Sequence, residues 1–127
     1  MVLLDVDAFN DINRRFGHNE GDRFLQALVE LVLLNLRNED LLCRYAGDRF
    51  LILLSDTGEE LATDKARQLQ NGIAWFCFYT HVSEKISATV STGVATCRDG
   101  NIEALMERAK IELLCNKEQN DKSRLVA

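Results

Sequence analysis

Residues 41–54 read LLCRYAGDRFLILL, two apolar runs separated by a short turn at residues 46–49. Runs of strand length on either side of a glycine-containing turn predict a β-hairpin. The turn carries an acid, Asp48, beside Gly47, and an acid beside a glycine can hold a metal and the phosphates of a nucleotide. The alternative is a plain type I′-like turn that uses both residues only for their backbone. The spacing leaves both interpretations open.

The rest of the chain alternates between helical and strand-like patterns. Apolar residues at helical spacing predict helices over residues 8–16, 57–75 and 101–117, and a further helix that ends at residue 36. We expect Asn19 or Asp22 to cap that further helix, and Thr57 to cap the one that follows the hairpin. Short apolar runs predict strands over residues 1–6, 41–45, 50–54, 86–97 and 123–126. This order indicates an α/β or α+β sandwich with a central, mixed five-stranded sheet flanked by helices.

The composition is typical of a globular protein with one domain, since 46% of the 127 residues are hydrophobic and 28% are charged. A formal net charge of -5 argues against broad binding to nucleic acid or to an anionic membrane. The N-terminus has no basic segment of a signal peptide. We therefore expect a cytoplasmic protein, or the cytoplasmic part of a larger membrane-attached sensor, with no nucleic-acid or membrane contact.

Four cysteines, Cys43, Cys77, Cys97 and Cys115, lie far apart without a C-x-x-C pair. Cys77 and His81 have the spacing of metal ligands, but no second pair completes a zinc site. The pattern predicts reduced, mostly buried thiols.

Asp5 and Asp7 stand two residues apart at the end of the first apolar run. Strand alternation would put both carboxylates on one face, unless the chain turns between them and lets one acid support the turn. Carboxylates of this kind suit Mg²⁺, especially if Asp48 converges on them from the hairpin. Solvated acids at a strand end are the alternative.

Two further polar pairs stand where a nucleotide could bind. Asn13 and Asp22 offer an amide and a carboxylate that match the edge of guanine, although they could equally be a solvated residue and a helix cap. Arg37 and Asp40, three residues apart, could form a local ion pair or a site for a phosphate and a guanine base. Spacing does not decide between these alternatives.

Three stretches of the chain resemble one known family. DVDAFNDINRRFGHNEGD, residues 5–22, looks like the D-x-D-x-F-K-x-I-N-D-x-x-G-H-x-x-G-D segment of GGDEF domains, the diguanylate cyclases of bacterial signalling. RYAGDRF, residues 44–50, falls where that family carries R-Y-G-G-D/E-E-F, and STGVA, residues 91–95, matches its S-x-G-V-A strand. The family's upstream helix and its L-T-G-L-x-N-R segment are absent. We therefore expect residues 1–127 to be a single domain, trimmed or split from a longer protein.

The resemblance implies a fold like that of nucleotide cyclases and polymerase palm domains, with a mostly antiparallel sheet. In active members two GTP-loaded domains meet, and metal-assisted attack of each 3′-hydroxyl on the other's α-phosphate yields cyclic di-GMP. The implied cofactor is Mg²⁺ or Mn²⁺. The implied partners are GTP, cyclic di-GMP, a second copy of the full-length protein, and sensory or EAL-type output domains in the same chain.

Roles carried over by position from the family fall on matching residues of this chain. The metal ligands, which are also the catalytic residues, would be Asp5 and Asp48, assisted by the carbonyl of Val6. The substrate would be bound by residues that contact its base or its phosphates: Asn13 and Asp22 for guanine, Gly47 along the nucleotide, and Lys117 for a phosphate.

The signature and its surroundings combine matches with departures. Arg37 and Asp40 match the R-x-x-D inhibitory site, where active members bind product. Ala46 replaces the first signature glycine, a mild change if the backbone there suits alanine. Arg49 replaces the signature glutamate and puts a cation where the family has an anion. That exchange can disrupt metal recruitment, and it can also provide a direct phosphate contact.

The phosphate-binding positions depart from the family as well. Asn10 stands where the family usually has a lysine, and the second basic residue near the C-terminus becomes Asp121, or Lys122 if one residue is inserted. Losing one charge-assisted phosphate contact costs about 1.5–3 kcal/mol, roughly ten- to a hundredfold in binding.

Three hypotheses remain. The departures at Arg49, Asn10 and Ala46 favour a degenerate domain that has lost most turnover and binds GTP and/or cyclic di-GMP in a regulatory role. The retained Asp5 and Asp48 support the alternative of an active diguanylate cyclase with product inhibition. The third hypothesis is a structural or dimerisation module that binds no nucleotide.

Overall fold

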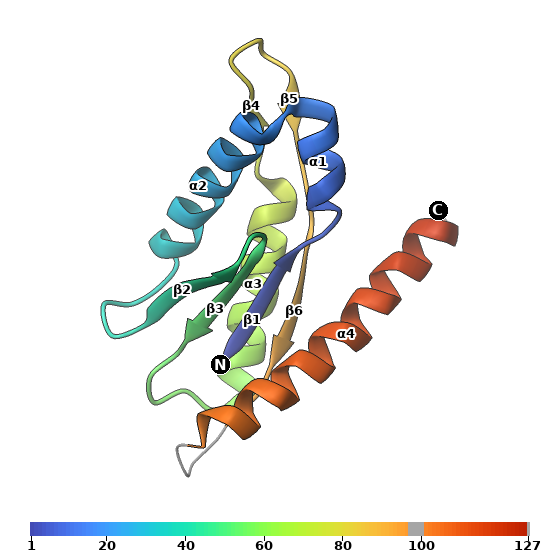
Figure 1. The fold of residues 1–127 in the computed structure, drawn as a ribbon. Coiled ribbons are helices and arrows are strands. Elements are labelled where there is room, and N and C mark those ends of the chain that lie inside the picture. The colour runs from blue at the N-terminus through green and yellow to red at the C-terminus, as the bar shows by residue number, and fades with distance from the viewer. Residues whose placement is uncertain (97–100, 127) are drawn as a thin grey trace.

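The computed structural model describes the backbone of residues 1–96 and 101–126 and, within these ranges, side chains up to Glu118. Its elements are β1 (Val2–Val6), α1 (Phe9–Phe16), α2 (His18–Leu34), β2 (Leu41–Ala46), β3 (Arg49–Leu53), α3 (Glu59–Trp75), β4 (Phe78–Tyr79), β5 (Lys85–Ile86), β6 (Val90–Val94) and α4 (Ile102–Val126), as Figure 1 shows. In the part of the chain described, no helix is apolar over a length that would cross a membrane.

The main sheet has four strands in the order β2-β3-β1-β6, and all of its pairings are antiparallel. Among the residues that the structure describes, β4 and β5 pair only with each other, as a separate ribbon. The mostly antiparallel α+β sandwich is thus confirmed, but the expectation of five strands with some parallel pairs is wrong. Residues 123–126, expected as the last strand, continue α4 instead. Extending an existing helix adds one backbone hydrogen bond per residue, which outweighs the weak strand signal of so short a run.

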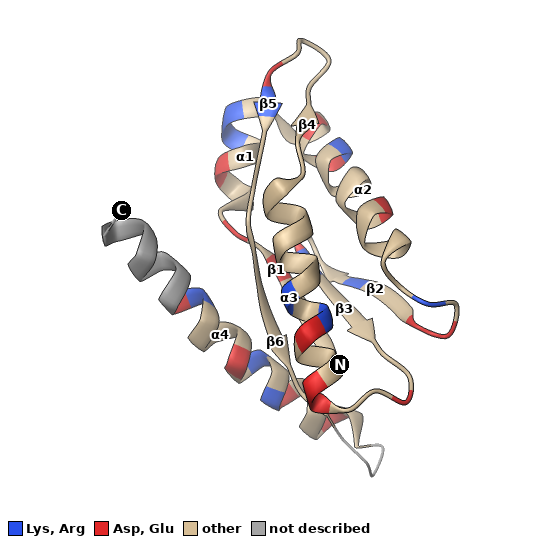
Figure 2. Ribbon diagram, turned by 180° about the vertical axis from the view of Figure 1, so that it is seen from behind, with Lys and Arg blue, Asp and Glu red and all other residues tan. Residues whose placement is uncertain are grey.

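Strand alternation divides β1 between the two faces of the sheet. Val2, Leu4 and Val6 join the core shared with α1, α2 and α3, whereas Leu3 joins a smaller core under α4. Figures 1 and 2 show α4 crossing one face of the sheet and α3 lying against the other. Asp5 follows the same alternation and is on the α4 face.

Gly93 allows α4 to approach β6 closely. A Cβ at this position would overlap the carbonyl oxygen of Ala109 and lie 2.7 Å from a backbone nitrogen one turn further along the helix. Farther along α4, Asn116 Nδ2 donates to the Thr92 carbonyl at 2.6 Å. The glycine of the STGVA stretch therefore sets the position of the helical turn from which Lys117 reaches the sheet.

The helix starts differ from the sequence predictions. α2 begins directly after Gly17, which has a φ of 92° that favours glycine, so neither Asn19 nor Asp22 is its cap. α3 is preceded by Gly58, and Thr57 donates its hydroxyl to a neighbouring backbone carbonyl instead.

The cysteine prediction is only partly confirmed. Cys43, Cys77 and Cys115 are free thiols, but they are exposed rather than buried. They stand on an edge strand, just beyond a helix and on an outer helix, where the sequence gives no sign of their exposure. Cys97 lies outside the described residues.

Candidate functional site

Asp5 is buried at the end of β1, with 1% of its surface exposed. Its Oδ2 accepts a hydrogen bond from Lys117 Nζ at 2.7 Å and lies 3.3 Å from Arg49 Nε. Arg49 faces Asp5 because the register of β1 and β3 pairs these two residues. Oδ1 is buried and has no hydrogen-bond partner in the part of the chain described. One carboxylate oxygen is thus held by two cations, and the other lacks a donor.

Both cationic side chains are partly accessible to solvent. Burial lowers the pKa of the Arg49 guanidinium, but its hydrogen bond with Tyr45 and the attraction of Asp5 and Asp48 leave the pKa above its ordinary value. The exposed fraction of the side chain is 39% for Arg49 and 30% for Lys117. Solvent, or a ligand, therefore reaches the cations even though Asp5 is buried.

The hairpin turn lies beside the end of β1. β2 ends at Ala46 and β3 begins at Arg49, so Gly47 and Asp48 form the loop, and the Asp48 carbonyl accepts from the Val6 N–H at 3.0 Å. Type I′ geometry requires a positive φ at both loop residues, and neither has one, so the predicted type I′ geometry is wrong. Ala46 likewise has no positive φ, which explains why alanine fits the first signature position.

Asp7 anchors the end of β1 to β6 and to the residue before it. Its carboxylate accepts hydrogen bonds from Thr89 Oγ1 and Ser91 Oγ, each at 2.7 Å. Its N–H donates to the Thr89 carbonyl at 2.9 Å. Ser91 is the cross-strand partner of Asp5, so the Asp7 carboxylate is held near Asp5 but by other partners. The two hydroxyl partners were missed, and their only sequence signal was their place in and beside the STGVA stretch.

Asn13 packs against Gly21, the residue before Asp22, where α1 packs on α2. The Asn13 amide oxygen rests so closely on Gly21 that a Cβ there would overlap it. That oxygen is buried and has no hydrogen-bond partner among the residues the structure describes, while the neighbouring Asp22 is exposed. An amide and a carboxylate at adjacent places can match the donors and acceptors of a guanine edge.

A group of polar side chains centred on the buried Glu20, which the sequence analysis missed, joins α2 to the turn between β4 and β5. Glu20 is 5% exposed, accepts from Arg23 Nη1 at 3.1 Å and bonds His81 Nδ1. The hydrogen bond with His81 is the main cause that lowers the pKa of Glu20, against the opposing effect of burial. Because Glu20 and His81 are 61 residues apart, no local sequence pattern predicts their contact. Cys77 and His81 have the spacing of metal ligands, but the His81 imidazole is bonded to Glu20.

Arg37 and Asp40 form the local ion pair that their spacing allowed. Asp40 is buried, accepts from the Arg37 backbone N–H at 2.9 Å and lies 3.2 Å from Arg37 Nη2. The same Nη2 donates to the Ser55 carbonyl at 2.7 Å and to Thr57 Oγ1 at 3.1 Å. The pair therefore joins the α2–β2 loop to the β3–α3 loop. Because 51% of the Arg37 side chain stays exposed, a ligand can still reach it.

We expect the protein to lose stability on acidification through Asp40. Burial raises the pKa of this carboxyl, but hydrogen bonds from Arg37 and Ser55 lower it more, so the net pKa is below its usual value. A carboxyl of this kind stabilises the fold above its unfolded-state pKa, about 3.9, and the contribution is lost as the pH falls through the folded-state value. Thermal unfolding of wild type and Asp40→Asn across pH tests this. At neutral pH, wild type should have a higher melting temperature than Asp40→Asn, and this difference should disappear below about pH 4. A difference that stays constant across pH would contradict the prediction.

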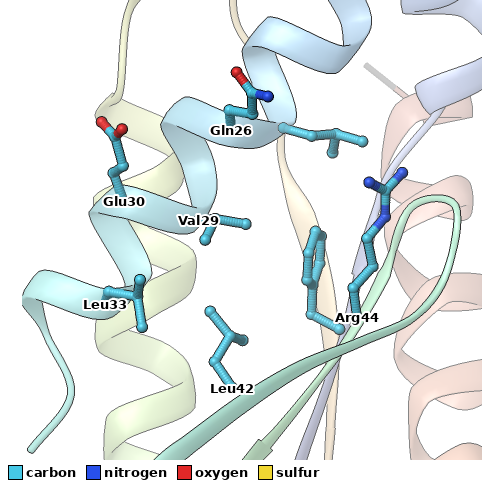
Figure 3. A pocket seen from close by; sticks show the side chains of 8 residues that line it. Gln26, Val29, Glu30, Leu33, Leu42 and Arg44 are labelled. Carbon is cyan, nitrogen blue, oxygen red and sulfur yellow. The ribbon is translucent and has the colours of Figure 1, made fainter.

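A cavity of about 470 Å³ lies between α2 and the β2–β3 hairpin, as Figure 3 shows. Its lining is mostly apolar, with Val29, Leu33 and Leu42 among the contributors. Arg44 reaches from this cavity to the turn, where its Nη2 donates to the Gly47 carbonyl at 2.6 Å. None of the binding residues expected from the sequence lines the cavity.

The divalent metal implied by the resemblance would be held by Asp5, Asp48 and the Val6 carbonyl. The orphaned Oδ1 of Asp5 suits a cation. Against this, Arg49 and Lys117 already surround the same carboxylate with two positive charges, which would repel a divalent cation there. Among the described residues, no three His, Cys, Asp or Glu side chains converge as a metal cluster. The residues present therefore do not fit the metal.

Comparison with known families covers almost the whole chain. The model of the diguanylate cyclase GGDEF domain matches residues 1–123. The chain belongs to the GGDEF domain family. This GGDEF domain is 36% identical over 111 residues to the response regulator PleD of Caulobacter vibrioides, an alignment that covers 85% of this chain and 24% of PleD.

Two further relatives agree with this assignment. Diguanylate cyclase DgcP of Pseudomonas aeruginosa is 35% identical over 111 residues, covering 86% of this chain and 16% of DgcP. The solved GGDEF domain of YfiN (TpbB) from the same species superposes with a TM-score of 0.87 at 26% identity, covering 93% of this chain and 74% of that one. The GGDEF domain described here thus spans about a quarter or less of the length of these two curated relatives.

Proposed function

We propose that this GGDEF domain is a degenerate member of bacterial cyclic di-GMP signalling, which binds GTP and/or cyclic di-GMP in a regulatory role with weak or no turnover. The observation that carries the proposal is the position of Arg49. It stands directly against Asp5, the residue that the family pattern assigns as a catalytic metal ligand. Lys117, assigned to phosphate, contacts the same carboxylate oxygen.

The arrangement separates nucleotide binding from turnover. The family's reaction is metal-assisted, and Arg49 opposes a metal at Asp5 through its charge. Among the described residues, no such charge opposes a nucleotide at the positions that the family pattern assigns to the guanine base and along the nucleotide. Asn13 packs against Gly21, next in sequence to the exposed Asp22, and nothing lies within 4 Å of where a Cβ of Gly47 would be. These contacts support a domain that binds its nucleotide and converts it poorly.

The test measures binding and turnover in one buffer. Calorimetry gives GTP binding by the purified chain in the presence of Mg²⁺ or Mn²⁺, and chromatography gives cyclic di-GMP formation. We expect wild type to bind GTP and form little or no product, and Arg49→Glu, which restores the anion of the signature, to form more. Arg67→Glu is the matched charge reversal, on an α3 side chain that is 69% exposed, and should change neither result.

Other results would support the competing hypotheses. Steady conversion of GTP by wild type would establish an active cyclase, the function for which the retained Asp5 and Asp48 argue. If neither GTP nor cyclic di-GMP gives a heat of binding, the hypothesis of a structural or dimerisation module would be supported instead.

Cyclic di-GMP is expected to bind at Arg37 and Asp40 through the exposed part of the Arg37 guanidinium. Arg37→Ala should weaken this binding at least about tenfold, because it removes a charge-assisted contact. Since Arg37 also bridges two loops, circular dichroism must confirm that the variant folds. Thr57→Val is the matched control, because it removes one acceptor of the bridge and leaves the guanidinium. Undiminished binding by a folded Arg37→Ala protein would disprove this site.

The same proposal extends to the surroundings of the domain. We place it in the cytoplasm, in a longer protein that dimerises and carries sensory or EAL-type output domains. In such a protein, nucleotide binding here would be a signal to the neighbouring domains. The second phosphate position, Asp121 or Lys122, lies beyond the last side chain that the structure describes.

A further inference from the structure

Arg49 and Lys117 converge on one oxygen of a single buried carboxylate. The two contacts come from different elements: β3 presents Arg49 through its register with β1, and α4 presents Lys117. Arg49 and Lys117 carry two positive charges against the one negative charge of Asp5, and the carboxylate of Asp48 attracts Arg49 as well. The positive charge is therefore part of the folded framework on both sides of Asp5.

Each cation has more donors than Asp5 can use. A guanidinium carries five N–H groups and an ammonium carries three, whereas the closest contact that each makes to Asp5 involves one nitrogen. Both side chains are partly exposed, so other N–H groups can face a ligand. Arg44 adds a third cation at the hairpin turn, where it holds the Gly47 carbonyl.

Phosphate oxygens are suited to these donors. A divalent cation beside a triphosphate neutralises phosphate oxygens and orients them, and arginine and lysine can provide the same neutralisation through charge-assisted hydrogen bonds. Here the charge is already in place without a metal. A divalent cation at Asp5 would have to displace the side chains of Arg49 and Lys117, or it would bind against their electrostatic repulsion.

We infer that this domain binds the triphosphate of GTP in its metal-free form, with Arg49 and Lys117 in the place of the divalent cation. The inference rests on the proposed function, because it concerns the nucleotide bound at the same site. It adds that binding does not depend on Mg²⁺. It also assigns Arg49 a positive role as a phosphate-binding residue.

Calorimetry of GTP with the purified chain, in EDTA and in excess MgCl₂, tests the inference. For wild type we expect the two dissociation constants to agree within about threefold. Arg49→Glu should bind at least about tenfold more weakly in EDTA, because it loses a charge-assisted contact and gains a like charge against the phosphates. Excess MgCl₂ should restore part of that loss. Lys117→Gln should weaken binding in EDTA in the same direction.

A second readout does not involve nucleotide. Excess MgCl₂ should leave the melting temperature of wild type unchanged, and should raise that of Arg49→Glu, in which Asp5 faces an acid that can share a metal. This melting experiment also shows whether the variants fold. Arg67→Glu, with its reversal on α3, should behave as wild type in both experiments.

The outcomes separate the inference from the proposal beneath it. GTP binding by wild type only when MgCl₂ is present would overturn the inference and leave the proposed function standing. No GTP binding in either buffer would overturn the inference together with GTP binding itself. If wild type and Arg49→Glu bind GTP equally well in EDTA, Arg49 does not contribute to the binding of the triphosphate.

Discussion

Gly93→Ala is expected to lower the free energy of unfolding by about 3 kcal/mol, the upper end of the usual cost of overpacking. The added Cβ would overlap the Ala109 carbonyl oxygen and lie 2.7 Å from the Leu113 backbone nitrogen. Both are backbone atoms of α4, so no change of side-chain rotamer relieves the overlap. The helix as a whole must move away from β6, and Lys117 would move with it away from Asp5.

Gly72→Ala is the matched control for this prediction. Gly72 lies inside α3, and nothing lies within 4 Å of its added Cβ. The same substitution should therefore raise stability, by about 0.5–1 kcal/mol, because alanine favours a helix interior. Urea unfolding followed by circular dichroism measures both variants. Opposite signs are expected, and a Gly93→Ala protein as stable as wild type would show that α4 does not approach β6 as closely as described.

Asp7→Ala is expected to lower the free energy of unfolding by about 2–4 kcal/mol, since hydrogen bonds to a buried charged group contribute about 1.5–3 kcal/mol each and do not add fully. Asp7 is 4% exposed and accepts from Thr89 Oγ1 and Ser91 Oγ. Removing the carboxylate deprives both hydroxyls of that acceptor. It also loosens the turn that follows Val6, next to the hairpin.

Two substitutions separate this role from a general effect of charge. Asp7→Asn keeps the shape and one acceptor oxygen, so its loss should be smaller than that of Asp7→Ala. Asp11→Ala removes a carboxylate that is 72% exposed and should cost about 0.5 kcal/mol or less. Urea midpoints provide the comparison. Equal losses for Asp7→Ala and Asp11→Ala would contradict the buried anchoring of Asp7.

Local sequence patterns were sufficient to predict features whose residues are close together both in the sequence and in space. The hairpin followed from two apolar runs around a short loop, and the place of Asp48 beside the end of β1 followed from pairing those runs with the first strand. The 37–40 ion pair was one of two possibilities that its spacing allowed. The prediction of a final strand over residues 123–126 was wrong, because the strand signal of so few residues is weaker than the tendency to extend the preceding helix.

Contacts between distant segments were beyond such reasoning. The partners in Glu20–His81 are 61 residues apart and those in Lys117–Asp5 are 112 apart, so no periodicity links them. The exposure of three cysteines was missed for the same reason, since a thiol is buried only if another element covers it.

The sequence by itself determined most of the strands and helices, the hairpin with its acid and the family pattern of the motifs, because these depend mainly on residues close together along the chain. Only the tertiary structure decided what the acids do. Asp7 became an anchor because β6 lies beside it, and Asp5 became the partner of two cations because strand register and helix packing bring Arg49 and Lys117 to one oxygen. A carboxylate's function depends on the charges around it, and here those charges come from the middle of the chain and from its last helix.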